Sequence, residues 1–176
     1  MGLEAYRLGI KFEDNLSTND LRKILETLGA KTVNIEYNGE VQMEVVSNKG
    51  IVELLLSQIV DRENVLEKIT GKKFFYTFCS NKDIGKTLLS IRIAKINPAE
   101  VIDELVKLID GLSMHLKIKF VWDIESHCEV SQPSFEELKR RYIVAQKNFN
   151  KWFNLQYKPI RCSEVFENIN TTNGEV

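Results

Sequence analysis

Gly85, Lys86 and Thr87 end a stretch that matches part of the phosphate-binding P-loop, G-x-x-x-x-G-K-[ST]. The first glycine of that pattern is replaced by Ser80. A P-loop also opens a helix whose N-terminus faces the phosphates. Here apolar residues instead alternate with others over residues 88–94, which predicts a β-strand. We therefore expect a turn at Gly85 that binds neither a nucleotide nor another cofactor.

His127 and Cys128 are neighbours, and a catalytic cysteine needs a base within hydrogen-bonding reach. Adjacent residues of a strand point to opposite faces, so His127 serves Cys128 only if both lie in a loop. The three cysteines, at positions 79, 128 and 162, fit neither a disulfide framework nor the spacing of a zinc site. We expect no metal. An enzyme with a dispersed site stays an alternative, with Glu36 and Glu44 as further candidates.

Basic residues dominate the segment between residues 139 and 163, which contains no Asp or Glu. Its seven positive charges leave the rest of the chain at −8, because the whole chain carries −1. Such an asymmetry indicates an interaction surface for an acidic partner. The candidate partner-binding residues are Lys139, Arg140, Arg141, Lys147, Lys151, Lys158 and Arg161.

Two interpretations compete for this basic segment. Aromatic residues are interleaved with the charges, and charge combined with stacking is typical of proteins that bind nucleic acids. The apolar residues also have helical spacing, which predicts a helix that docks on the body of the domain through one stripe. The basic side of that helix then balances acidic residues of the same fold. The stripe consists of Phe135, Leu138, Tyr142, Ala145, Phe149 and Trp152, all expected to be buried.

Hydrophobic periodicity predicts the elements that position these residues. In the first half we expect a strand at 5–12, a helix from the caps at 17–20 to Gly29, and a hairpin of strands at 33–37 and 41–45. Pairing Tyr37 with Val41 keeps the apolar residues of the hairpin on one side, so its loop has three or five residues and a bulge. Residues 50–60 and 61–69 look helical, although 51–56 also suits a strand.

In the second half we expect strands at 74–79, 88–94 and 116–124, a helix capped by Asn97 and closed by Gly111, and a long C-terminal helix that starts with a capping box at Ser134. In the strand at 116–124, Phe120 and Trp122 belong to the apolar face. Asp123 then lies on the polar face.

This order of elements predicts an α+β fold, with a mainly antiparallel sheet and helices packed chiefly on one face. A strand–helix–strand unit near each end suggests two ferredoxin-like halves. The length suits a single domain, expected at 1–163, and the polar residues 164–176 read as a flexible tail. No apolar run is long enough for a membrane helix, and the scattered cysteines point to the cytoplasm.

The lack of a catalytic constellation favours a non-catalytic, cytoplasmic protein-binding module. Immunity proteins and antitoxins, which inhibit a cognate bacterial toxin by covering its active site, are examples of this class. The expected partner is another protein with an acidic surface. A nucleic-acid-associated protein is the first alternative and an enzyme the second. We expect no membrane partner, and the sequence leaves the oligomeric state open.

Overall fold

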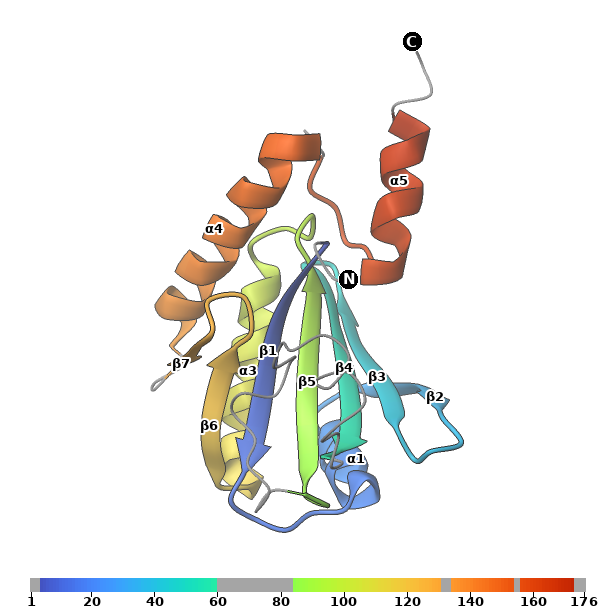
Figure 1. Ribbon diagram of the computed structural model, residues 1–176, viewed down its shortest axis with the longest axis vertical. Helices are drawn as coiled ribbons and strands as arrows, with labels where there is room; N and C mark the ends of the chain where they lie inside the picture. The colour runs from blue at the N-terminus through green and yellow to red at the C-terminus, as the bar shows by residue number, and fades with distance from the viewer. Residues whose placement is uncertain (1–3, 60–83, 131–133, 154–155, 173–176) are drawn as a thin grey trace, which may run out of the picture.

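The computed structural model describes residues 4–59, 84–130, 134–153 and 156–172. They form an α+β structure around one seven-stranded antiparallel sheet (Figure 1). The elements in chain order are β1 Ala5–Phe12, α1 Thr18–Thr27, β2 Lys31–Ile35, β3 Val41–Ser47, β4 Gly50–Gln58, β5 Thr87–Ala94, α3 Val101–His115, β6 Ile118–Asp123, β7 Cys128–Val130, α4 Phe135–Phe153 and, after a short 3-10 helix at Cys162–Glu164, α5 Val165–Thr172.

The strands follow the order β2-β3-β4-β5-β1-β6-β7, and each neighbouring pair is antiparallel. The first strand of the sequence therefore lies inside the sheet, between β5 and β6. These two run in the same direction and are connected through α3. By contrast, three strands separate β1 from β2. The two strand–helix–strand units are not equivalent, so the expected pair of ferredoxin-like halves is not confirmed.

The main hydrophobic core lies between one face of the sheet and the helices α1, α3 and α4, the last of which contributes Leu138, Tyr142 and Ala145 (Figure 1). The strand expected at 5–12 is confirmed as β1, where Leu8 and Ile10 are buried and lie opposite Ile91 and Leu89 of β5. The other face of β1 is also largely buried, including Lys11, so its burial does not alternate. Helix α1 starts as expected at Ser17, whose side chain accepts a hydrogen bond from the backbone of Asp20. Its buried side carries Leu21 and Leu25.

A second, smaller core joins the end of α4 to the segment that follows it. Phe149 of α4, Ile160, Val165 and Ile169 are buried there against the ends of β1 and β5. The expected flexible tail at 164–176 is therefore helical over its described part, α5. Because α5 follows α4, the long C-terminal helix is not confirmed as the last element.

Residues 50–58 form the strand β4 and not a helix. Leu54 and Leu56 face the main core opposite Ile91 and Leu89. Most of β4 is buried on both faces, which explains why its apolar run has no helical or strand period. The strand after Thr87 is confirmed as β5. The helix expected at 61–69 and the strand expected at 74–79 lie outside the described residues.

The hairpin of β2 and β3 has its predicted bulge but a different register. Ile35 pairs with Val41, so the loop has the five residues 36–40, and the register shifts between Thr32 and Asn34. Gly39 has a φ of +82°, which favours glycine at this turn. The expected pairing of Tyr37 with Val41 is wrong by two residues. The apolar residues of β2 and its turn consequently stay exposed: Val33 by 58%, Ile35 by 55% and Tyr37 fully.

Helix α3 begins at Val101, so Asn97 is not its N-cap. The Asn97 side chain is instead buried in the loop after β5, where it bonds to distant backbone groups. The helix also does not end at Gly111 but continues to His115. A β-carbon at position 111 would lie 2.7 Å from Cδ2 of Leu28, so glycine there lets the end of α1 approach α3 closely. In the described residues, no helix is long and apolar enough to cross a membrane.

Candidate interaction surface

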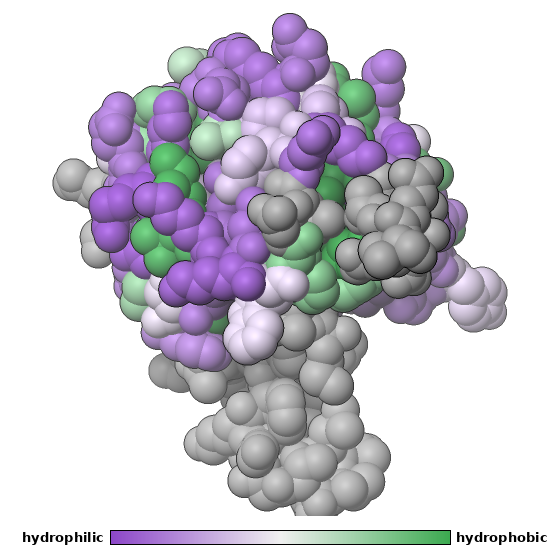
Figure 2. Space-filling view, turned by 90° about the horizontal axis from the view of Figure 1, so that it is seen from above, coloured by the Kyte–Doolittle hydropathy of each residue, from purple (hydrophilic) through white to green (hydrophobic). Residues whose placement is uncertain are grey.

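The basic segment begins in helix α4, which has one buried and one exposed side. Ser134 accepts a hydrogen bond from the backbone of Glu137, as expected of an N-cap. The buried side consists of Leu138, Tyr142, Ala145, Gln146 and Phe149. The exposed side consists of Glu136 in the first turn and of Arg140, Val144, Lys147, Asn148, Lys151 and Trp152. Figure 2 shows the end of the molecule towards which α4 runs, where hydrophilic side chains surround smaller hydrophobic patches.

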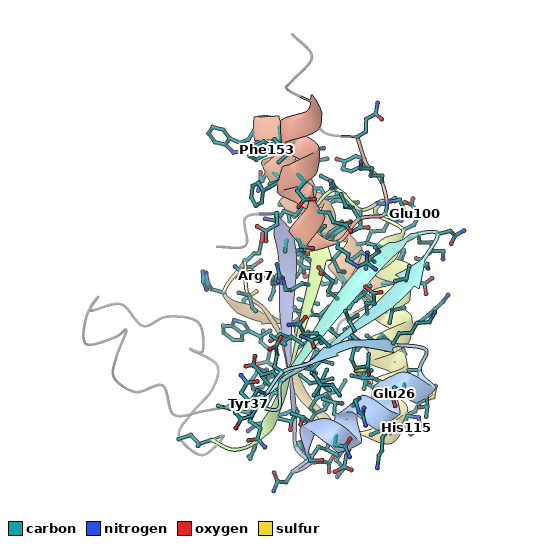
Figure 3. The ribbon with its side chains drawn as sticks, turned by 90° about the vertical axis from the view of Figure 1, so that its right-hand side faces the viewer. Arg7, Glu26, Tyr37, Glu100, His115 and Phe153 are labelled. Atoms are coloured by element: carbon teal, nitrogen blue, oxygen red, sulfur yellow. The ribbon has the colours of Figure 1, made fainter. Side chains whose placement is uncertain are left out.

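The expected burial of Trp152 is wrong, because its side chain is 82% exposed. The preceding residue of the stripe, Phe149, is buried in the smaller core and contacts Phe153, with 4.8 Å between the ring centroids. The last turn of α4, where Phe153 lies, extends beyond the ends of the strands (Figures 1 and 3), and Trp152 belongs to neither hydrophobic core of the described residues. Truncating Trp152 therefore removes no core packing.

The three arginines of the basic segment bind carboxylates of the same chain. Arg140 and Arg141 both contact Glu137 on the preceding turn of α4. These two guanidinium groups hold the pKa of Glu137 below its usual value. Arg161 donates two hydrogen bonds to Glu44 of β3, with N–O distances of 2.9 and 3.0 Å. The interpretation that the basic residues balance acids of the same fold therefore applies to the arginines.

The four lysines occupy different environments. Lys147 and Lys151 are exposed on α4, one above the other at a spacing of four residues. Lys139 is half-buried, and its Nζ lies 4.8 Å from the ring centroid of Phe135. Lys158 is exposed after α4, and its backbone N–H bonds to Ile96. The structure thus does not gather the seven predicted residues into one site. The outward-facing part of the basic segment on α4 consists of the exposed Lys147 and Lys151, with Trp152 beside them.

Arg141 also forms the most buried charged cluster near α4, around Asp123. Sequence reasoning placed Asp123 on a polar strand face, but β6 buries Val121 and Asp123 opposite Ile10 and Leu8 of β1. The half-buried residues of the other face are Phe120 and Trp122. The expected assignment of the two faces of β6 is therefore wrong. Asp123 faces the core because of the register in which β6 pairs with β1, a strand more than a hundred residues earlier in the chain.

The Asp123 carboxylate is surrounded by hydrogen-bond donors. Tyr6 and Ser126 donate hydroxyl hydrogens at 3.2 and 2.9 Å, and the backbone N–H groups of Glu125 and Ser126 donate as well. Arg141 Nη1 lies 3.2 Å from the same carboxylate. Burial and the neighbouring Asp123 charge raise the pKa of Tyr6 well above its usual value. The cluster therefore holds Tyr6 as a neutral donor and Asp123 as an acceptor, which joins β1, β6 and α4.

His127 and Cys128, the candidates of the enzyme alternative, lie beside this cluster, and their described hydrogen bonds do not join them as nucleophile and base. Cys128 Sγ accepts a hydrogen bond from Arg141 Nη1 at 3.1 Å, and His127 is exposed with a positive φ of 51° in the turn before β7. The two carboxylates of the hairpin are also not paired with each other. Glu44 binds Arg161, and Glu36 accepts hydrogen bonds from Asn34 and Gln42. In the described part of the chain, no three His, Cys, Asp or Glu residues are placed to hold a metal ion.

Sequence reasoning missed Glu137 and Asp123 as partners of Arg141. The spacing of four residues between Glu137 and Arg141 is a usable signal, because such pairs meet on a helix. Nothing local indicates Asp123, which is eighteen residues away from Arg141 and on another element. Comparisons with protein families, with curated proteins and with solved structures found no match to this chain.

Replacing Arg141 by methionine is expected to lower the free energy of unfolding by about 3 kcal/mol, because it leaves a buried carboxylate without its cationic partner. Urea unfolding at neutral pH measures the change. Arg140→Met is the matched control, since the Arg140 side chain is 64% exposed and its pair with Glu137 lies at the surface. Its effect should stay within about 0.5 kcal/mol. Equal losses in both variants would contradict the role given to the Asp123 cluster.

Proposed function

We propose that this chain is a non-catalytic protein-binding module that engages an acidic surface of its partner through the exposed side of α4. One observation carries the proposal: Lys147, Lys151 and Trp152 are exposed together on a stretch of chain without a single acidic residue. Val144, on the same side of the helix, is 49% exposed. An exposed tryptophan beside positive charges is the composition of an interface anchor, since tryptophan and charged contacts dominate binding energy.

The overall charge supports a protein rather than a nucleic acid as the partner. The basic segment carries seven positive charges while the remainder carries −8 for a total of −1. A long polyanion would extend beyond α4 and meet this acidic remainder, which repels it. A protein with a local acidic patch contacts α4 alone. The arginines add little to either interaction, because Arg141 and Arg161 already bind carboxylates of the chain.

The specific case that we propose is an immunity- or antitoxin-type inhibitor in the cytoplasm. Such proteins are small modules that cover the active site of a toxin, and a rigid helix with an exposed anchor suits that task. Cys128 and Cys162 are free thiols, in keeping with a reducing compartment. Co-expression of the chain with its partner, once the partner is identified, tests this case. If the chain is such an inhibitor, it restores the growth of cells in which the partner alone arrests growth.

Replacing both Lys147 and Lys151 by glutamine is expected to weaken binding to the partner, and the loss should shrink at high salt because exposed charges are screened. Trp152→Ala should weaken binding about 30-fold or more, as expected of an anchor worth at least about 2 kcal/mol. Both variants should melt within a few degrees of the wild type, since the replaced side chains are exposed.

The measurement starts with tagged chain and an extract of the native host, followed by mass spectrometry and calorimetry with the recovered protein. The control variant replaces the exposed Lys23 of α1 and Lys107 of α3 by glutamine. It matches the loss of two charges and should leave binding unchanged. Recovery that a nuclease abolishes would favour the nucleic-acid alternative, and equal binding by all variants would remove α4 as the interface.

A further inference from the structure

The two edges of the sheet differ in how they are protected. The edge strand β7 has three residues, and Val130 is buried. The other edge, β2, has five residues, and all five are exposed. Among the described strands β2 pairs with β3 alone, so its outer side has no strand neighbour there. Exposed apolar side chains at Val33 and Ile35 add to this edge, and its protection against pairing is confined to one end, where Lys31 and the bulge between Thr32 and Asn34 lie.

The backbone of Ile35 points its hydrogen-bonding groups to the open side of β2. Glu36 donates its N–H to the carbonyl of Glu40, so the groups of Glu36 point inwards to the hairpin partner. Successive residues of an antiparallel strand direct their N–H and C=O groups to alternate sides. Ile35 therefore presents both groups outwards. The bulge between Thr32 and Asn34 interrupts the edge on one side and the turn after Glu36 ends it on the other, so Ile35, the last residue of β2, is the middle of the short regular stretch 34–36.

We propose that β2 is the interface of a homodimer, in which the β2 strands of two copies pair antiparallel about a two-fold axis at Ile35. A two-fold axis between antiparallel strands places one residue opposite its own copy, because hydrogen-bonded and non-hydrogen-bonded pairs alternate. Centred at Ile35, the pairing joins the outward N–H and C=O groups of the two copies. It also sets Asn34 of each copy opposite Glu36 of the other.

The charges of β2 are complementary in this register. Lys31 and Asn34 share one face of the sheet, since they pair with Glu44 and Gln42 of β3. Glu36 lies on the same face, where its carboxylate accepts hydrogen bonds from Asn34 and Gln42. Because the bulge adds one residue between Lys31 and Asn34, Lys31 takes the next position after Asn34 on this face. Lys31 of each copy is then the diagonal neighbour of Glu36 of the other, within reach of a long side chain. The two-fold axis forms this ion pair twice. This complementarity favours a second copy of the chain as the partner of the β2 edge.

The arrangement leaves α4 accessible. The hairpin of β2 and β3 projects from the side of the sheet away from α4, and Tyr37 lies far from Phe153 at the end of α4 (Figures 1 and 3). A dimer through β2 therefore carries two α4 surfaces facing away from the shared edge. The dimer forms through β2 alone and needs no partner protein.

Sedimentation velocity of the full chain over a wide range of concentration tests the dimer. The wild type should dimerise, and Ile35→Lys should raise the dissociation constant about 30-fold or more through the buried charge that it places at the axis. Ile35→Pro should also give a monomer with an intact fold, since it removes an N–H that faces outwards. The control Val46→Lys places the same charge at a residue of β3 that is 55% exposed, and it should leave the dimer unchanged.

Charge exchange tests the register. Lys31→Glu and Glu36→Lys should each weaken the dimer, and the double variant should restore it because the diagonal pair re-forms with opposite signs. A wild type that stays monomeric at every concentration would overturn the proposal, even if β2 accepts a strand from another protein. A dimer that Ile35→Lys leaves intact, or a double variant no better than the single ones, would overturn it as well.

Discussion

Replacing Asn97 by alanine should lower the free energy of unfolding by about 4 kcal/mol, because it leaves two buried backbone N–H groups without an acceptor at about 1–3 kcal/mol each. The Asn97 Oδ1 accepts hydrogen bonds from the backbone N–H groups of Ile51 and Ile160 at 3.2 and 3.0 Å. Its Nδ2 donates to the carbonyls of Ala94 and Ile160. One buried amide thus joins the start of β4, the end of β5 and the segment after α4.

Thermal and urea unfolding measure this effect, with an expected drop of about 10 °C in Tm for a chain of this size. Asn148→Ala is the matched control, since Asn148 is exposed on α4 and alanine favours a helix there. That variant should be as stable as the wild type or slightly more so. A small and equal change in both variants would show that Asn97 does not hold these three segments together.

Alkaline pH is expected to destabilise the protein steeply, because three buried acids keep their protons in the folded state. Burial raises the pKa of Tyr6, Tyr142 and Cys162 well above their usual values, and the neighbouring Asp123 and Glu53 act in the same direction on Tyr6 and Cys162. In the unfolded chain these groups ionise near their ordinary pKa values, about 8.5 for cysteine and about 10 for tyrosine.

The sign follows from the protons bound in each state. Below about pH 8.5 all three groups are protonated in both states, and the stability that they contribute is fully present. As the pH rises further, the unfolded chain releases protons that the folded chain retains, so the free energy of unfolding falls. Above about pH 10 the unfolded chain binds close to three protons fewer than the folded chain. The free energy of unfolding should then fall by about 4 kcal/mol per pH unit.

Urea unfolding at a series of pH values measures this slope. Cys162→Ala should remove the part of the decline that starts near the cysteine pKa and leave the tyrosine part, so the comparison uses slopes and not absolute stabilities. The thiol of Cys162 lies in the smaller core with Ile160 and Val165, and so the variant also creates a small cavity whose cost does not vary with pH. A stability that stays constant up to about pH 11 would contradict the buried state of these groups.

The sequence alone determined the elements whose period is local. Alternation over 5–12 and 88–94 predicted β1 and β5, and the stripe of Leu21 and Leu25 predicted α1. The aromatic stripe and the cap at Ser134 predicted α4, because a helix that docks by one side repeats its apolar residues every three to four positions. The charge asymmetry around Lys147 and Lys151 is likewise a property of the sequence.

Only the tertiary structure decided which partner each element has. The run at 51–56 is a strand because it lies between β3 and β5, a neighbourhood that its own residues do not encode. Asp123 is buried because β6 pairs with β1 in one register, and Trp152 is exposed because α4 extends past the sheet. Periodicity reports the average contrast between core and solvent along one element. Register, edge position and the acids that bind Arg141 and Arg161 from other strands depend on residues distant in the sequence, so the place of β2 at the edge of the described sheet and the outward side of α4 emerge only after folding.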